Sequence, residues 1–285
     1  MRKKQAAIIA LICGIGIFLL KLFAFFVSNS IALLSDALES IINILASGLM
    51  FFSISISDRD PDKSHEYGHQ KIEEISCLLE GVLIVLAAVF IIITAFERLS
   101  IKDYLLELNF GVILSVVATV INLGISLILF RTAKRTGSIA LEGDAKHLLS
   151  DVISTLIVWI GLFVVKLTGW IIIDPLLAVV GSVLILRLGI KLIIKSSNRL
   201  MDQSCIEEEK RIMEVLERHS FHFIDFHNLK TRRHGNQIFA EIHLSVNASL
   251  SIKEGHDLTD HLENDLTQEL PNCYVIIHIE PPEES

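Results

Sequence analysis

Two stretches in the first half of the chain place ionisable and amide side chains at helical spacing within apolar sequence. Residues four apart lie on one face of a helix. The stretch D-A-L-E-S-I-I-N therefore brings Glu39 beside Asn43. The stretch D-A-K-H-L-L-S-D brings His147 beside Asp151 in the same way. Two such helices side by side offer four converging ligands, the number that a divalent transition metal such as zinc prefers. We call these side chains the helical quartet.

Ionisable residues within apolar helices are costly, which makes the helical quartet a functional candidate. The alternative is that its members only join helices through hydrogen bonds. Asp36 and Asp144 begin the same two stretches. Because they lie nearer the helix ends, we expect them outside the ligand set or solvated.

A second candidate site lies between the apolar stretches, where Asp62, His65 and His69 fall within eight residues. This spacing is typical of metal ligands, and we call the three residues the loop triad. The alternative is a solvated polar loop. Every histidine before residue 200 belongs either to the loop triad or to the helical quartet, which favours the metal interpretation.

Eight of the eleven histidines lie beyond residue 200. His227 and His243 fall in predicted strands, and strand alternation places His278 and Glu280 on one face. His256 begins a predicted helix. A sheet can bring these five residues together as a further metal site, which we call the tail cluster. The remaining histidines have no such pattern and are expected on the surface: His219, His222, His234 and His261.

The elements that position these residues begin with six apolar runs, each long enough to span a bilayer, for which a helix needs roughly 20 residues. The runs cover about residues 6–27, 31–56, 76–97, 109–131, 146–166 and 171–194. Lys and Arg concentrate before the first run, after the sixth, and in every second connection between them. This asymmetry predicts that both termini are cytoplasmic.

Composition changes near residue 200 and predicts a domain boundary there, with domains at 1–202 and 203–285. The second segment carries a net charge of −9 and the first +1. In the second segment we expect helices over 206–219 and 252–269 and strands over 224–233, 237–247 and 274–279. The order α-β-β-α-β is that of an open sheet with helices on one face. The predicted fold class is an all-α membrane domain of six transmembrane helices plus a C-terminal α+β cytoplasmic domain.

Composition and missing motifs exclude several classes of protein. Hydrophobic residues make up 52% and charged residues 20% of the chain, which excludes a disordered protein and a basic nucleic-acid binder. The four cysteines are far apart and form no C-x-x-C, which argues against a disulfide scaffold or a zinc ribbon. The chain has no phosphate-binding G-x-x-x-x-G-K-[ST] and no hydrolase motif. We therefore expect no ATP drive, no catalytic cofactor and no enzyme activity.

The motifs together resemble the cation diffusion facilitator family, in the layout of its bacterial YiiP-like divalent metal exporters. The resemblance covers nearly the whole chain. It rests on the two helical stretches, on P-D-K-S-H-E-Y-G-H from Pro61 to His69, and on I-I-H-I-E-P ending at Pro281.

This resemblance implies a six-helix membrane domain with a ferredoxin-like cytoplasmic domain, acting as a homodimer in a prokaryotic inner membrane. It implies export of a divalent cation, zinc first, against inward proton flow. The helical quartet would be the transport site, and the tail cluster would lie at the dimer interface. The family also implies a contact between Lys71 and Asp202.

Three residues depart from the zinc-type pattern of the family. Glu39 and Asn43 stand where that pattern has Asp or His followed by Asp, so an amide oxygen replaces one carboxylate. Glu280 stands where the pattern has Asp. Zinc, manganese, iron, cobalt and cadmium therefore all remain open as the metal, because softness and geometry only bias affinity.

The chemistry of the ligands suggests how protons would be coupled to transport. Glu39, His147 and Asp151 bind metal when deprotonated and release it when protonated. The expected partners are therefore the lipid bilayer, a divalent metal cation, protons and a second copy of the chain. Two alternatives stay open: a membrane-anchored metal sensor signalling through the tail cluster, and an intramembrane hydrolase with its metal on His147 and Asp151.

Overall fold

The computed structural model describes residues 2–28, 31–99, 110–168 and 173–282; within the helices some side chains, including that of Glu39, lie outside the described set. The chain divides into two compact units, residues 1–197 and 198–285.

Up to Leu200, the described residues form six helices, as predicted. They are α1 (Lys3–Ser28), α2 (Ile31–Ser57), α3 (Ile72–Leu99), α4 (Phe110–Thr136), α5 (Ile139–Thr168) and α6 (Ile173–Leu200). At 1.5 Å per residue, helices of this length exceed the roughly 30 Å of a bilayer core. Within the described residues, α1, α3, α4 and α6 have an apolar window long enough to cross a membrane, and α2 has a shorter one over Asn43–Ser57.

Several of these helices extend beyond the predicted apolar runs. Helix α3 starts at Ile72 and α5 at Ile139, whereas apolar sequence predicted starts near 76 and 146. Polar residues continue both helices, because Glu73 and Asp144 are buried there among other helices rather than solvated. The extension adds about one turn to α3 and about two turns to α5, and it places Asp144 inside the bundle.

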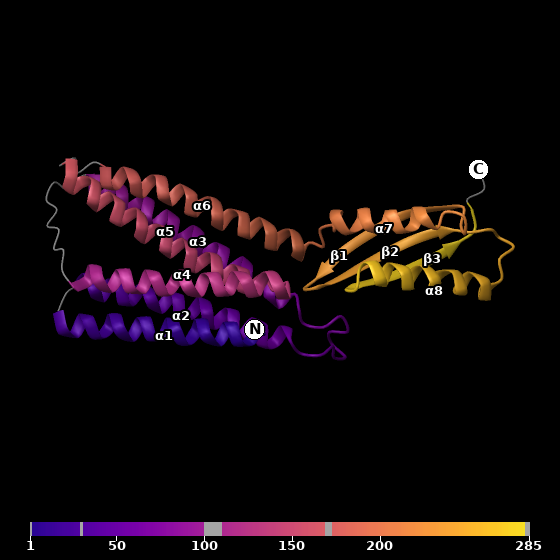
Figure 1. Ribbon diagram of the computed structural model, residues 1–285, viewed down its shortest axis with the longest axis horizontal. Helices are drawn as coiled ribbons and strands as arrows, with labels where there is room; N and C mark the ends of the chain where they lie inside the picture. The colour runs from indigo at the N-terminus through magenta and orange to yellow at the C-terminus, as the bar shows by residue number, and fades with distance from the viewer. Residues whose placement is uncertain (1, 29–30, 100–109, 169–172, 283–285) are drawn as a thin grey trace. The chain divides into compact units, whose positions relative to one another are not determined.

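The surface of the first unit is apolar, and its interior is lined with small residues. Phe23, Phe90 and Leu45 are each about two-thirds exposed, while Ala6 and Ala140 are fully buried. Large apolar side chains facing outward and small residues between helices are typical of membrane bundles. Helix α5 lies at the centre, packed against α2, α3 and α4 (Figure 1).

One buried carboxylate ties four parts of this bundle together. Glu73 in α3 accepts a hydrogen bond from Ser57 Oγ at 2.7 Å and lies 2.8 Å from Lys3 Nζ. Ser138, just before α5, also donates to it. Lys3 is shared with Asp58, whose carboxylate is 3.0 Å away. Because a buried charge needs a partner, this network holds the ends of α1, α2 and α3 together beside the start of α5.

The second unit has the predicted α-β-β-α-β order. It consists of α7 (Ile206–Arg218), β1 (Asp225–His234), β2 (Gln237–Ser245), α8 (Ile252–Glu269) and β3 (Cys273–Glu280). Strand β2 lies in the middle, antiparallel to β1 and parallel to β3. The turn Gly235-Asn236 joins β1 to β2, as predicted, and α8 provides the crossover that a parallel pair needs.

Local chemistry fixes the start of α8. Ser251 caps the helix: its hydroxyl accepts from the backbone N–H of Glu254 at 3.3 Å, and the Glu254 carboxylate accepts from the backbone N–H of Ser251 at 2.8 Å. The hydrogen bond from the Ser251 hydroxyl, with that from its backbone N–H, lowers the pKa of Glu254. This reciprocal arrangement satisfies two backbone groups at the helix end.

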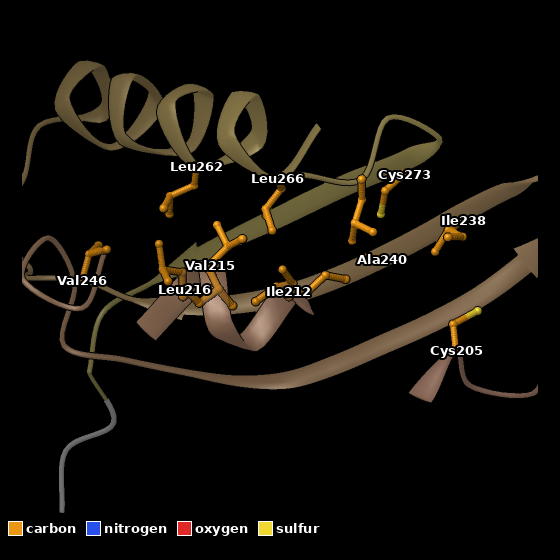
Figure 2. Packing of buried hydrophobic residues seen from close by; sticks show 13 residues of the cluster. Cys205, Ile212, Val215, Leu216, Ile238, Ala240, Val246, Leu262, Leu266 and Cys273 are labelled. Carbon is orange, nitrogen blue, oxygen red and sulfur yellow. The ribbon is translucent and has the colours of Figure 1, made fainter. Parts of the chain in front are cut away.

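Alternation along β2 separates the core from an open face. The side chains that point to the helices are buried: Ile238, Ala240, Ile242 and Leu244. They pack against α7 and α8, which contribute Ile212, Val215, Leu216, Leu262 and Leu266 (Figure 2). His243 has the opposite parity and therefore lies on the face away from the helices.

Candidate metal centres

Three members of the helical quartet meet between α2 and α5. Asn43 Nδ2 donates to Asp151 Oδ2 at 2.8 Å, and Asn43 Oδ1 lies 3.2 Å from His147 Nε2. The amide therefore bridges the two residues that the i, i+4 spacing places on one face of α5. The side chain of Glu39, the fourth predicted ligand, lies outside the described residues.

A second polar link lies one turn further along the same two helices. Ser47 Oγ donates to both oxygens of Asp144, at 3.1 and 3.2 Å. Asp144 is fully buried, so the predicted alternative of a solvated carboxylate is wrong. Ser126 of α4 donates to the carbonyl of Ala145 at 2.8 Å and fixes α5 from the other side. These contacts hold α5 in the rotation that turns His147 towards Asn43.

Helix α3 adds a residue that the motif analysis did not identify. Glu80 is fully buried, and its Oε2 lies 3.9 Å from His147 Nδ1. Neither carboxylate oxygen has a hydrogen-bond partner among the described residues. Gly143 permits this approach, because a Cβ there would lie 3.2 Å from Glu80 Cγ and 3.3 Å from Cys77 Cα. The general rule that intramembrane carboxylates are functional candidates would have singled Glu80 out.

The loop triad is brought together by a tight turn. Asp62 Oδ1 accepts from the backbone N–H groups of Ser64 and His65, both at 2.8 Å. Its two oxygens lie 3.3 Å from His65 Nδ1 and 3.3 Å from His69 Nε2. The N–H of Ser64 is the largest cause of a lowered pKa at Asp62. The carboxylate is therefore held ionised beside two imidazoles, at a distance from which one cation can contact all three.

Sheet register assembles most of the tail cluster on the open face. His227 pairs with His243 across β1 and β2, and His243 pairs with His278 across β2 and β3. Glu280 lies among them, 2.9 Å from His227 Nε2, 3.1 Å from His243 Nδ1 and 3.8 Å from His278 Nε2. His256 is not with them: it is exposed on α8, and its Nε2 lies 3.6 Å from Asp260.

The other tail histidines differ in part from the predicted surface positions. His222 and His261 are exposed and His219 is half-buried. For His234 the prediction is wrong: the residue is 8% exposed, and its ring packs edge-on to Phe239. It ends β1 at the hairpin, where the neighbouring strand covers it.

The cysteines do not extend any of these sites. All four are free thiols. In the tail, burial raises the pKa of Cys273 to about 11 and also raises that of Cys205. Because only the thiolate binds metal well, these groups are poor ligands near neutral pH. The sites therefore consist of imidazole nitrogens and carboxylate or amide oxygens.

The predicted contact between Lys71 and Asp202 would join the two units and stays a prediction. Within the second unit, Asp202 has a positive φ of 56°. Its carboxylate lies 3.9 Å from Arg232 of β1.

Comparison with known proteins covers both units. The family model described as cation efflux transmembrane domain matches residues 7–201, and the model described as cation efflux protein, cytoplasmic domain, matches residues 206–282. The uncharacterized transporter sll1263 of Synechocystis sp. is 34% identical over 93% of this chain and 86% of its own length. The cation-efflux pump FieF of Shewanella oneidensis is 29% identical over 92% of this chain and 88% of its own.

A solved structure is similar to part of the chain. The zinc form of a putative zinc transporter, CzrB, is 39% identical, covers 26% of this chain and 85% of its own, and has a TM-score of 0.26.

Proposed function

The chain belongs to the cation efflux family, the cation diffusion facilitators, and from that premise we propose that it exports a divalent transition metal, zinc first, from the cytoplasm in exchange for protons. It is a membrane protein and a metal cation transporter, in a family of transporters rather than enzymes. The export direction, the metal and the coupling ion are our proposals. The name of the FieF relatives, cation-efflux pump, supports the proposed export direction.

The observation that carries the proposal is the bridge from Asn43 to His147 and Asp151 across α2 and α5. It gathers an imidazole, a carboxylate and an amide oxygen at one point within the helical bundle. Nitrogen and oxygen ligands of this kind suit zinc, and also manganese, iron or cobalt. A metal entering here would take over lone pairs that now serve the bridge.

We further propose that Glu80 supplies the negative charge that Asn43 does not. A carboxylate without a hydrogen-bond partner is costly in a buried site. It lies on the opposite side of the His147 ring from Asn43, since it approaches Nδ1 while Asn43 approaches Nε2. A divalent cation between these helices would satisfy Glu80 by binding one of its carboxylate oxygens.

Proton exchange follows from the same ligands. Carboxylates and imidazole bind metal only when deprotonated, so metal and protons compete for the site. When the site faces the cytoplasm, metal displaces protons, and when it faces outward, protons displace metal. Helix rocking that alternates these two states would couple inward proton flow to metal export.

The loop triad and the tail cluster are proposed to recruit metal and to regulate the transporter. The tail holds four of its five predicted ligands on one open face, and His256 stands apart on α8. A second copy of the chain would bring its own ligands to such a face. We therefore propose a homodimer in a prokaryotic inner membrane, with both termini cytoplasmic.

The test is metal flux in proteoliposomes that contain a zinc-sensitive dye and carry an imposed pH gradient. The proposal expects zinc uptake into the vesicles that rises with the gradient and stops when an ionophore collapses it. Uptake that does not depend on the gradient would contradict the proposed proton exchange. The absence of uptake for every divalent metal would contradict the proposed export. The second outcome would favour a membrane-anchored metal sensor, which the exposed tail cluster would also serve.

A further inference from the structure

A second group of metal-binding side chains lies in the tail, away from the tail cluster. His219, His261 and Asp265 place one ligand atom each within 4.8 Å of one another. His219 Nε2 lies 2.9 Å and His261 Nε2 3.8 Å from Asp265 Oδ2. We propose that these residues form a separate divalent-metal site, zinc by preference, joining the end of α7 to α8.

The hydrogen bonding of His219 supports a metal at this point. Its Nδ1 donates to the backbone carbonyl of Val215 at 2.8 Å, because a carbonyl can only accept. The other nitrogen, Nε2, faces the Asp265 carboxylate and can meet it in two ways: as an N–H donor in the imidazolium form, or with a lone pair that shares a divalent cation with the carboxylate. The Nδ1 bond orients the ring for the second arrangement, as in known metal sites.

The fold positions the three ligands on rigid elements. His261 and Asp265 are four residues apart on α8 and so share one face of the helix. His219 caps the C-terminus of α7, whose Val215 and Leu216 are anchored in the core. The rings of His219 and His261 meet edge to face, with centroids 5.3 Å apart. Metal at this site would therefore link two helices that the core already holds together.

The ligand set indicates the kind of metal. Two imidazole nitrogens and one carboxylate oxygen leave one position of a tetrahedron open. Water can fill it, since His261 is exposed and Asp265 is about one-third exposed. His222 can also fill it, because its ring centroid lies 6.5 Å from that of His219 and its side chain is exposed. The site lies on the helical side of the sheet, whereas the tail cluster occupies the other face, so the two sites can load independently.

Helix α8 contains a matched control for this proposal. His256 and Asp260 repeat the same His-Asp spacing of four residues, with their side chains 3.6 Å apart. In the described structure they belong to no group of three possible ligands. Asp260→Asn therefore removes an equivalent carboxylate from the same helix without touching the proposed site.

The experiment counts metal on the full-length protein in detergent. The parent carries His243→Ala and Glu280→Gln, which disable the tail cluster, and is stripped with chelator and titrated with Zn²⁺ or Co²⁺ alone. Asp265→Asn and His261→Ala are each expected to lose one bound equivalent, or to bind it about tenfold or more weakly, as for loss of a metal-site partner. Asp260→Asn should keep the parental number.

Cobalt absorption gives a second readout, because a site with imidazole ligands produces visible bands, and the share contributed by this site should be missing from the spectra of these two variants. Circular dichroism and gel filtration confirm that each variant is folded. Equal stoichiometry and affinity in the parent, Asp265→Asn and His261→Ala would overturn the proposal. Since transport is not measured, this result is independent of whether the chain exports zinc.

Discussion

The helical quartet and the tail cluster use similar ligands in opposite surroundings. Between α2 and α5, Asn43 already satisfies His147 and Asp151 through hydrogen bonds. On the open sheet face, three histidines surround the single carboxylate of Glu280, each partly exposed to solvent. A buried polar group must be paired at all times, whereas an exposed one can turn to water. Without metal, the bundle site pairs His147 and Asp151 with Asn43 but leaves Glu80 without a hydrogen bond among the described residues. The sheet ligands contact one another through Glu280 and also reach solvent.

This difference suggests different tasks. Metal entering the bundle must displace existing hydrogen bonds, and those bonds are available again when it leaves, which favours repeated exchange. Metal on the sheet replaces the contacts of the histidines with Glu280 and links three strands at once, which favours retention. Positioning also differs: strand register sets the sheet ligands, while helix packing through Ser47, Asp144 and Gly143 sets the bundle ligands.

Asp151→Ala is expected to cause the largest loss of metal flux. The change removes an anionic ligand where water cannot replace it cheaply. It also leaves Asn43 Nδ2 without its acceptor. We expect proton-driven zinc flux to fall to background in proteoliposomes while the protein still folds. Near-normal flux in the purified variant would remove Asp151 from the site; Asp260→Asn in the tail is the control.

Glu80→Gln is expected to have the next largest effect. It preserves shape and removes the buried carboxyl group beside His147. If Glu80 compensates for Asn43, flux should fall about tenfold or more, equivalent to roughly 1.4 kcal/mol of lost stabilisation. Glu97→Gln, on the exposed side of the same helix, is the matched control and should leave flux unchanged.

The double variant Glu80→Gln with Asn43→Asp separates charge from packing. Returning a carboxylate at position 43 should restore part of the flux and alter the order of preference among zinc, manganese, iron and cobalt. In the wild-type background Asn43→Asp alone should bind metals more tightly and release them more slowly, lowering both KM and maximal flux. If the double variant is no better than Glu80→Gln, the role of Glu80 is packing.

Substitutions in the tail cluster should reduce metal flux less than those between α2, α3 and α5. His243→Ala or His278→Ala removes one of three imidazoles around Glu280, so zinc binding to the tail should weaken while flux falls only severalfold. Binding that draws ligands from two copies also tightens the dimer. We therefore expect zinc to shift wild-type protein, but not these variants, towards the dimer in analytical ultracentrifugation at low concentration. A zinc-independent dimer in all three proteins would place the cluster away from the interface.

The sequence predicted elements and local pairs well, and contacts between distant elements poorly. Apolar length indicated six helices, and alternation around Gly235-Asn236 indicated the hairpin. The spacing of four residues correctly joined His147 to Asp151 as partners of Asn43. Glu80 was missed because it is a lone carboxylate in the third apolar run with no partner on its own helix.

The remaining omissions have the same cause. His219 and His261 come from two helices, and only the packing of α7 on α8 brings them to Asp265. The charges that meet at Glu73 are equally distant in sequence, with Lys3 seventy residues away. Spacing rules describe one element at a time, so a site assembled from several elements becomes visible only once they are packed.

The smallest expected effect concerns the loop triad and its turn. The Asp62 pKa is lowered because Ser64 N–H and His65 N–H donate to the ionised carboxylate. A lowered pKa in the fold means that this contribution is full above the ordinary Asp value of about 3.9 and is lost only as the pH falls through the lower value. Hydrogen exchange should therefore show a protected Ser64 amide at pH 4, with protection lost on further acidification, whereas the His65 amide also donates to the backbone carbonyl of residue 62 and should stay protected. Asp62→Ala should abolish the protection of Ser64 at every pH while reducing flux only slightly, since an exposed site recruits metal without enclosing it. A loss of flux as complete as that of Asp151→Ala would instead make the loop triad part of the transport path and remove the contrast between buried and exposed sites.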